Sequence, residues 1–384
     1  MPVPHPPFVK FRDDLTGRET LFERPREIIV ASTAKQYLQA LEAAEAARQA
    51  GRWLAGYFSY EAGYLLEPKL AGLLPDRRRG PLAVLGVFDG PSESTRLEPG
   101  RATTNGPIFD ARAAWSFQDY EKRFRRLHQH LRQGDCYQAN LTFPVHAAWS
   151  GEPLAAFDAL IARQPVKYGA LVALGEPLVL SRSPELFFAI DSDSMIETHP
   201  MKGTTPRGRT PEEDRQLKEF LREDEKSQAE NRMIVDLLRN DISLISEVGS
   251  LDVPELFRVE SYPTVHQMVS RVRAKLRPEV TISQIFAALF PCGSVTGAPK
   301  IRAMQILREL EEAPREAYCG AIGWIAPGGP MRFSVAIRTL SLFSGGEAIY
   351  NVGGGVVFDS TAEGEYEECL LKAKFATGTS PVSG

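Results

Sequence analysis

The chain has 384 residues, of which 43% are hydrophobic and 24% are charged, and its formal net charge is −4. These proportions are typical of a globular protein, and the length favours two interleaved cores over a single ordinary core. The acidic balance disfavours nucleic acid and anionic membranes as partners, because no basic field would attract either of them.

The start of the chain and the cysteine spacing indicate the expected cellular location and the state of the thiols. The proline-rich start lacks the basic and apolar regions of a signal peptide, and no apolar run approaches the roughly 20 residues that span a bilayer, so we expect a cytoplasmic location. The cysteines Cys136, Cys292, Cys319 and Cys369 form no CxxC pair. This spacing disfavours a zinc site or a disulfide framework.

The first 106 residues are predicted to form an N-terminal region that interleaves with the rest of the chain. Residues 90–106 are rich in Pro, Gly, Ser and Thr, so we place a surface excursion or linker there, followed by the main domain at 107–384. The elements expected before it are a strand pair at 19–30, a helix from Ser32 or Thr33 to Gly51, and buried strands at 53–66 and 81–88.

The main domain mixes helices and strands without strict βαβ order, which favours an α+β class. An amphipathic helix is predicted from Ser116 to Gly134, and its basic outer face is interpreted as ordinary solvated surface. The further strands are expected at 134–143, 169–190, 317–326, 331–343 and 349–360, and the further helices from Thr210, at 224–241, at 281–290, from Pro299 and at 362–376.

Two positions place an ionisable group in an unusual local sequence. Glu185 interrupts an apolar run, so we expect it to be partly buried, although a strand-edge salt bridge is an equally good interpretation. Lys202 lies in the segment His199–Gly208, where two prolines and two glycines exclude a helix or a central strand. The lysine is therefore predicted on a loop, where such a residue is usually a solvated surface charge.

Two predicted helices direct glutamates toward the core. Glu230 directly precedes apolar positions of its helix and leans inward, although Lys226, four residues earlier, could be its partner. In the closing helix Glu368 aligns with the apolar positions, and the periodicity leaves Glu367 possible. Two carboxylates suit Mg²⁺, which binds few protein oxygens and keeps waters that an anionic substrate can replace.

The remaining features point to an anionic ligand. Residues 292–300 form a glycine-containing loop before a helix, where free backbone N–H groups favour an anion. The short glycine spacing and Ile301 in place of Ser or Thr exclude a Walker A loop. Arg338 interrupts an apolar run, and Gly353–Gly355 remove side chains within a strand so that a ligand can approach. The residues predict a site for a small polyanion.

Between Ser116 and the end, the chain contains a series of ordered sequence blocks: GDCYQANLT, SRSPELFF, HPMKGTTPRG, DEKSQAENRMIVDLLRND, CGSVTGAPKIRAMQI, YCGAIGW, VAIRTL, and GGGVVFDS leading to EYEECLLKA. In these blocks the sequence resembles the chorismate-utilising enzymes. The resemblance is weaker upstream, where LFERPREIIVA is similar to the short N-terminal version of the family. It implies two interleaved subdomains with large, mostly antiparallel β-sheets, helices outside and an active site in the central cleft.

The resemblance implies roles for individual residues. Glu230 and Glu368 would hold Mg²⁺, which in turn holds the ring carboxylate of chorismate, and Glu185 would be the general acid that helps the ring 4-hydroxyl to leave. His266 corresponds to an active-site histidine of the family, with a satisfied core histidine as the alternative. The substrate-binding residues would be Tyr318, Arg338, Ser294, Gly354, Gln138 and Thr204.

Two of these positions distinguish branches of the family. Gln138 stands where isochorismate and salicylate synthases carry a lysine that activates water, so their reactions are disfavoured. Lys202 favours the branch that aminates ring carbon four, since the anthranilate-forming branch has alanine there. Lys202 would add at carbon two, and ammonia would then expel it. The attacking amine must be neutral, so its pKa must be lowered by desolvation or by a nearby cation.

The expected activity is therefore the conversion of chorismate and ammonia to 4-amino-4-deoxychorismate, on the route to para-aminobenzoate and folate, with ammonia supplied by a separate glutamine amidotransferase subunit. The alternatives are an anthranilate-forming enzyme and a non-catalytic subunit that binds chorismate. Three departures from the family pattern are Cys292 for glycine, Ser227 for an acidic residue, and Leu21-Phe22-Glu23-Arg24 for the Leu-Leu-Glu-Ser motif. The last of these disfavours feedback by tryptophan.

Overall fold

Two large sheets organise the chain in the computed structural model, which describes residues 5–94, 107–262 and 265–383. Most of the predicted linker lies outside the described residues. The first sheet follows the order β21 (Val382–Ser383), β7 (Ile108–Ala113), β8 (Gln138–Trp149), β20 (Glu347–Val356), β19 (Thr339–Leu342), β10 (Leu178–Ser183), β9 (Tyr168–Ala173), β1 (Phe8–Asp13), β2 (Arg18–Glu23) and β6 (Ser92–Ser94), and β16 (Gly297–Ala298) pairs with β8.

The second sheet also combines strands from both ends of the sequence. Its N-terminal strands pair with C-terminal ones, as β4 does with β17, so position 106 marks no border between the sheets. Its order is β13 (Met201–Pro206), β15 (Val265–Lys275), β12 (Met195–Thr198), β11 (Leu186–Ile190), β18 (Met331–Val335), β17 (Ala321–Ile325), β4 (Trp53–Phe58), β5 (Ala83–Phe88) and β3 (Glu27–Ala31), and β14 (Asp252–Ser261) pairs with β15.

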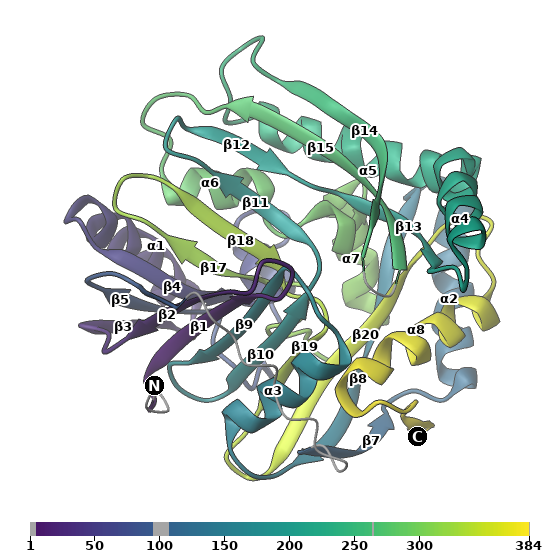
Figure 1. Cartoon of the computed structure of the whole chain (residues 1–384), viewed down its shortest axis with the longest axis horizontal. Coiled ribbons are helices and arrows are strands. Elements are labelled where there is room, and N and C mark those ends of the chain that lie inside the picture. The colour runs from purple at the N-terminus through teal and green to yellow at the C-terminus, as the bar shows by residue number, and fades with distance from the viewer. Residues whose placement is uncertain (1–4, 95–106, 263–264, 384) are drawn as a thin grey trace.

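The helices lie on the outer faces of the sheets. Figure 1 shows α1 and α6 beside the second sheet and α8 beside β8 and β20 of the first. None of the described helices is long and apolar enough to cross a membrane. The α-helices are α1 (Ala34–Gln49), α2 (Phe117–Gln133), α3 (Pro153–Arg163), α4 (Pro211–Glu223), α5 (Glu225–Ser243), α6 (Ile282–Leu289), α7 (Lys300–Leu310) and α8 (Ala362–Thr377), and the 3₁₀ helices are η1 (Tyr60–Leu65), η2 (Ala71–Leu73) and η3 (Gly293–Val295).

The predicted helix ends follow from local chemistry. Thr33 and Ser116 each cap a helix and complete a capping box with the residue three positions later, so free backbone N–H groups of the first turn are satisfied. Gly134 ends α2 in a left-handed conformation with φ of 75°, which costs a glycine little. Thr210 caps α4 as predicted, and Pro211 occupies the first turn, where a proline costs no helical hydrogen bond.

A shared apolar cluster holds the two sheets together at one end. Phe22 of the first sheet packs against Phe88 of the second, with ring centroids 5.3 Å apart, and Tyr57 and Val172 belong to the same buried group. Burial of these aromatic side chains favours the sheet-on-sheet arrangement, because each removes a large apolar area from water. The α+β prediction of two large antiparallel sheets is confirmed.

Three predicted elements differ from the structure. The strand expected at 53–66 ends at Phe58, where the chain turns into η1. The strand expected at 331–343 is two strands, β18 and β19, which belong to different sheets. Lys202 lies on β13, at the edge of the second sheet, and not on a loop. Prolines are tolerated at such an edge, and Pro206 ends this strand.

Candidate active site

The chain crosses between the sheets twice at one place. Residues 184 and 185 connect β10 with β11, and residues 336–338 connect β18 with β19. The crossings are joined by backbone hydrogen bonds, because the N–H of Val335 donates to the Glu185 carbonyl at 3.1 Å and the N–H of Arg182 donates to the Arg338 carbonyl at 2.9 Å. Sequence periodicity cannot reveal such a crossing, because two short strands joined by a crossing have the same apolar pattern as one long strand.

Glu185 is buried at its crossing, with 6% of its surface exposed. Burial raises the pKa of its carboxyl to about 7, although Ser294, Lys202 and Arg338 each favour the charged form. The predicted burial is confirmed. Glu185 forms no ion pair among the described side chains, so the interpretation as a strand-edge salt bridge is wrong. A carboxyl with this pKa can hold a proton at neutral pH and release it.

Arg338 lies at the second crossing, with φ of 50°. A non-glycine residue in this region is strained, and such strain is concentrated at functional sites. Burial lowers the pKa of the guanidinium, against the effect of Tyr318 and Glu185. Tyr318 is itself buried, and burial raises the pKa of its hydroxyl well above the ordinary value. Arg338 makes no side-chain hydrogen bond or ion pair within the described part of the chain.

Lys202 reaches from the edge of the second sheet toward the first. A Cβ placed on Gly355 of β20 would lie 3.0 Å from Lys202 Nζ and 2.7 Å from Gln138 Nε2, so glycine leaves room for both groups. Burial lowers the pKa of the Lys202 amine, and Lys372 acts in the same direction, while Glu230 and other carboxylates oppose them. The solvated-surface interpretation of this lysine is therefore wrong, and the site lies between the sheets.

The closing helix α8 brings three charged side chains to this site. Glu368 pairs with Lys372 at 2.6 Å, and although burial opposes it, Lys372 and Lys202 hold the pKa of the Glu368 carboxyl below its ordinary value. Glu365 accepts a hydrogen bond from Ser360 at 2.7 Å, and burial raises the pKa of its carboxyl. The Lys372 amine also donates to the Gly353 carbonyl at 2.9 Å.

Glu365 is a site residue that the sequence interpretation missed. Glutamates in the first turn of a helix are usually solvated, because the helix dipole already favours them there. A Cβ on Gly354 would nevertheless lie 2.5 Å from Glu365 Oε2. The available signal was its spacing, since Glu365 lies three residues before Glu368 and such residues share a helix face. Gly354, which the resemblance assigns to substrate binding, thus has its Cα facing a carboxylate of the protein.

A magnesium ion fits the donor chemistry of α5 and α8 only in part. Glu230 on α5 is half-buried, and both Glu230 and Glu368 act on the charge of Lys202. No group of three or more His, Cys, Asp or Glu side chains in the described ranges is arranged to hold a metal. The two carboxylates can bind Mg²⁺ only if water and substrate supply the other oxygens of its octahedral shell. These side chains do not form a site in which protein ligands alone would surround the ion.

Ser294 joins the site from η3. It is 8% exposed, favours the charged form of Glu185 by a hydrogen bond, and its hydroxyl lies 3.2 Å from the Cys292 thiol. The glycines of this loop serve packing, because a side chain on Gly293 would collide with Leu237 and one on Gly297 would collide with the backbone of β8. The loop therefore follows the first sheet closely before α7 begins.

Two predicted site residues make no hydrogen bond to the other site residues in the described part of the chain. His266 is fully buried on β15, where one ring nitrogen lies 2.9 Å from an Asp214 carboxylate oxygen and the other lies 2.9 Å from the Ser261 hydroxyl. With both nitrogens occupied, this side chain matches the alternative of a satisfied core histidine. Thr204 lies two residues after Lys202 on β13, where it is exposed.

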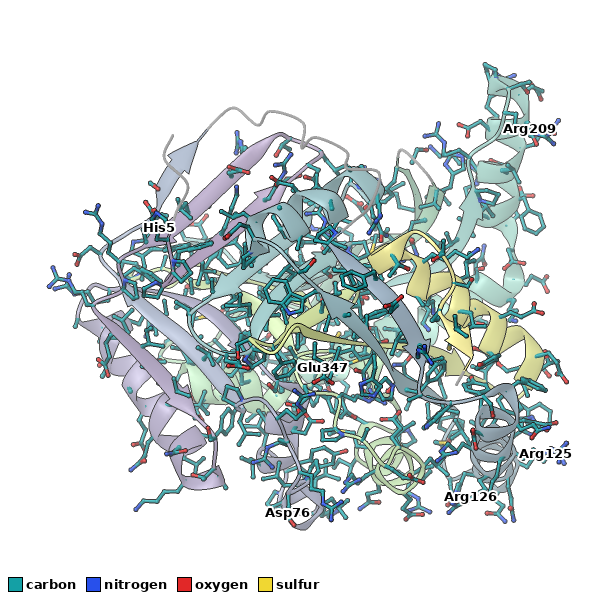
Figure 2. All side chains as sticks on the ribbon, turned by 90° about the horizontal axis from the view of Figure 1, so that it is seen from below. His5, Asp76, Arg125, Arg126, Arg209 and Glu347 are labelled. Carbon is teal, nitrogen blue, oxygen red and sulfur yellow. The ribbon has the colours of Figure 1, made fainter. Side chains whose placement is uncertain are left out.

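The basic face of α2 is solvated, as predicted. Figure 2 shows Arg125 and Arg126 at the rim of the molecule, where both side chains are exposed. Arg125 pairs with Glu121 at 2.6 Å, a spacing of four residues within one helix. Such exposed pairs contribute little to stability.

Comparison with known proteins agrees with this geometry. The family model described as chorismate binding enzyme matches residues 12–378. Aminodeoxychorismate synthase component 1 of Escherichia coli (strain K12) is 44% identical over 255 residues, which cover 66% of this chain and 56% of that protein. The protein of the same name from Klebsiella aerogenes is 40% identical over 304 residues, which cover 78% and 67%. The chain thus spans somewhat more than half of these curated relatives.

The fold has a close counterpart among solved structures. Anthranilate synthase component I from Streptococcus pneumoniae TIGR4 superposes with a TM-score of 0.80 and 26% identity, and the match covers 93% of this chain and 91% of that one. The family match, the relatives and the fold agree. The chain belongs to the family of chorismate-binding enzymes.

Proposed function

We propose that the protein is the chorismate-aminating component of an aminodeoxychorismate synthase, which converts chorismate and ammonia to 4-amino-4-deoxychorismate. The observation that carries the proposal is the Lys202 amine, which lies between the sheets beside Gly355 with a lowered pKa. Relatives named aminodeoxychorismate synthase component 1 support the same assignment. The product would serve para-aminobenzoate and folate synthesis in the cytoplasm.

The proposed reaction has two allylic displacements. The neutral Lys202 amine adds at ring carbon two, both ring double bonds shift, and the 4-hydroxyl leaves as water with a proton from Glu185. The Lys202 nitrogen becomes a secondary ammonium in this first step. Ammonia then adds at carbon four, the double bonds shift back, and Lys202 leaves as the neutral amine. The proton that the incoming nitrogen loses returns to the Glu185 carboxylate. A Glu185 pKa of about 7 suits this proton transfer, because a general acid works best near the ambient pH.

The other residues hold the substrate during these steps. Arg338, unpaired among the described residues and next to Tyr318, would bind the enolpyruvyl carboxylate, and Ser294 would add a hydrogen bond. Glu230 and Glu368 would hold Mg²⁺. When bound, the ion would neutralise charge on the ring carboxylate.

Ammonia is proposed to come from a glutamine amidotransferase subunit. The relatives' name "component 1" supports a partner of this kind. Ammonia produced on a partner avoids the protonation that bulk water imposes at neutral pH, so a paired subunit fits a reaction that requires the free amine. The proposal predicts that glutamine supports turnover only when the amidotransferase is added.

A product assay tests the function. The purified protein is incubated with chorismate, Mg²⁺ and an ammonium salt at a series of pH values from about 7, where Glu185 is half protonated, to about 9, where more ammonia is neutral. Products are separated by chromatography and identified by mass. Formation of 4-amino-4-deoxychorismate by the natural chain, and its loss in Lys202→Ala, would support the proposal. Anthranilate together with pyruvate would instead assign the chain to the anthranilate-forming branch.

That branch is the second candidate because it is also represented among the relatives. A protein named anthranilate synthase component 1 3 from Haloarcula marismortui is 41% identical over 255 residues. The position of Lys202 separates the two candidates, since an amine at this place would compete with ammonia for carbon two. Turnover to anthranilate that persists in Lys202→Ala would favour the second candidate.

A further inference from the structure

Gln138 stands out among the buried polar side chains. It is the first residue of β8 and is 0% exposed, yet neither its amide nitrogen nor its amide oxygen has a hydrogen-bond partner among the described residues. A buried amide without partners is costly, and most are satisfied by protein, water or ligand. The family resemblance implies that this side chain contacts the substrate, but the reaction steps above give it no part.

Gly355 shows that the side chains of Gln138 and Lys202 lie close together. The Cβ that Gly355 lacks would lie 2.7 Å from Gln138 Nε2 and 3.0 Å from Lys202 Nζ. The two nitrogens therefore face the same point of β20, and they can be no further apart than these two distances laid end to end. One comes from the first sheet and the other from the edge of the second.

The lysine is also free of direct partners. Lys202 Nζ makes no hydrogen bond and no ion pair within 4.0 Å in the parts of the chain that the structure describes, although four charged groups act on it from a distance. These groups are Glu230 on α5, Lys372 and Glu368 on α8, and Glu185 at the sheet crossing. An unpaired amine on a half-buried lysine and an unpaired, fully buried amide are thus neighbours.

The amide atom that faces Gly355 and Lys202 in the structure is Nε2. Because neither amide atom is hydrogen-bonded to a described residue, a half turn about Cγ–Cδ exchanges the two atoms without breaking a bond. We propose that Gln138 is a positioning residue for Lys202: after this turn its Oε1 accepts one N–H of the neutral amine and so directs the amine lone pair toward the ring. The inference rests on the proposed function and gives this side chain a part in it. A neutral amine has two N–H donors and one lone pair, so fixing one donor restricts rotation about the Cε–Nζ bond. Correct alignment of a nucleophile contributes strongly to rate.

The amide suits this task better than either obvious replacement. A carboxylate would also accept the N–H, but its negative charge would stabilise the ammonium form, which has no lone pair to attack with. A hydrocarbon side chain would leave the amine free to rotate. An amide is an acceptor without charge, so it orients the amine and leaves its proton affinity to the surroundings.

Two substitutions separate these effects. Gln138→Glu preserves size and the acceptor but adds charge, and Gln138→Leu removes the acceptor at similar volume. Gln133→Glu, at the exposed end of α2, is the matched control because it makes the same change of charge on the surface. Thermal unfolding of each variant shows whether it is folded.

The first measurement is steady-state amination with ammonium ions across pH. We expect Gln138→Leu to lower kcat by about 10- to 100-fold and to change the KM for chorismate by less than about threefold, because orientation and not binding is lost. We expect Gln138→Glu to move the acid limb of the kcat profile upward by about one pH unit or more. Gln133→Glu should behave like the natural chain.

The second measurement does not require turnover. Trace labelling of Lys202 with acetic anhydride at a series of pH values, read by peptide mass spectrometry, reports when the amine becomes neutral. Gln138→Glu should shift that midpoint upward, while Gln138→Leu should not. An unchanged midpoint in Gln138→Glu, or an unchanged kcat in Gln138→Leu, would overturn the proposal. Should the leucine variant fail to fold, the near-isosteric glutamate variant decides.

The outcomes also distinguish a failure of the proposed function from a failure of the positioning role of Gln138. A natural chain that forms no 4-amino-4-deoxychorismate contradicts the proposed function, whatever Gln138 does. In that case the labelling midpoint still shows whether the amide and the amine are in contact. A productive natural chain with an unshifted midpoint in Gln138→Glu contradicts only the positioning role.

Discussion

Two arginines of this molecule, the buried Arg315 and the half-buried Arg338, have opposite surroundings. Arg315 is 2% exposed and donates to both carboxylate oxygens of Glu311 at 2.7 Å, to the Val295 carbonyl at 2.8 Å and to the Asn140 carbonyl at 2.7 Å. Its guanidinium also lies over the Tyr60 ring. Arg338 sits at a strained φ and contacts no acceptor among the described side chains.

The difference separates scaffold from binding site. Arg315 is satisfied within the fold, so its charge has no capacity left for a ligand, and it joins η3, β8 and the segment after α7. Arg338, Lys202 and Gln138 keep unsatisfied donors or acceptors in the space between the sheets. Natural proteins retain such groups where a ligand completes them. A stability test and an activity test should therefore distinguish the two arginines.

The largest expected loss of stability follows Arg315→Leu. Removing the arginine leaves the Glu311 carboxylate buried and unpaired, so the free energy of unfolding should fall by about 3 to 5 kcal/mol. Urea unfolding followed by circular dichroism measures it. Arg125→Leu on exposed α2 is the control and should change the value by less than about 0.5 kcal/mol. Similar stability of the two variants would remove the proposed scaffold role.

Arg338→Leu should have the reverse pattern. We expect kcat/KM for chorismate to fall by about 100- to 1,000-fold, because a buried charge partner of a carboxylate is lost. The free energy of unfolding should change by less than about 1 kcal/mol, since no partner within the described chain is orphaned. Steady-state kinetics and urea unfolding test both parts. A stable variant with normal kinetics would contradict the comparison.

The third prediction concerns Glu185. As a general acid with a pKa of about 7, it should give an activity profile that falls above pH 7, and Glu185→Gln should lower the rate by about 100-fold and remove that alkaline limb. Because the folded-state pKa lies above the ordinary 4.5, the contribution of this group to stability is full below about pH 4.5 and is lost as the pH rises through 7.

Urea unfolding at pH 5 and pH 8 checks the sign of this effect. The natural chain should lose stability over this interval relative to Glu185→Gln, since the glutamine carries no charge to bury. A Glu185→Gln variant that keeps the alkaline limb would assign that limb to another group.

The smallest expected effect belongs to Glu365→Gln. Glu365 lies near Glu368 and influences it electrostatically, so its neutralisation should raise the Mg²⁺ concentration for half-maximal activity by about tenfold. A magnesium titration at saturating chorismate measures the change. Glu363→Gln, on the exposed side of the same first turn, is the matched control. An unchanged requirement for the metal would separate Glu365 from its site.

The sequence was sufficient where local pattern determines position. Helical periodicity predicted the partial burial of Glu230, and the burial of Glu185 followed from its apolar neighbours. The same periodicity placed Glu368 inward, but its side chain is 53% exposed, because its partner Lys372 lies on the same open side of α8. The surroundings of His266 could not be predicted in this way. Strand alternation says that His266 and Gln267 point to opposite faces of the sheet, but not which face packs against α4. The proximity of Gln138 to Lys202 depends on pairing of β8 with β20 and on contact between the sheets, which only tertiary structure fixes.

The paired crossings between the sheets fix two charged groups relative to each other. Backbone hydrogen bonds join Val335 to Glu185 and Arg182 to Arg338, so Glu185 and Arg338 stand on one hydrogen-bonded unit. Lys202 comes instead from β13, a strand at the edge of its sheet with a neighbour on one side only. Local loosening of that edge would therefore displace the amine and leave the spacing between the carboxyl and the guanidinium unchanged.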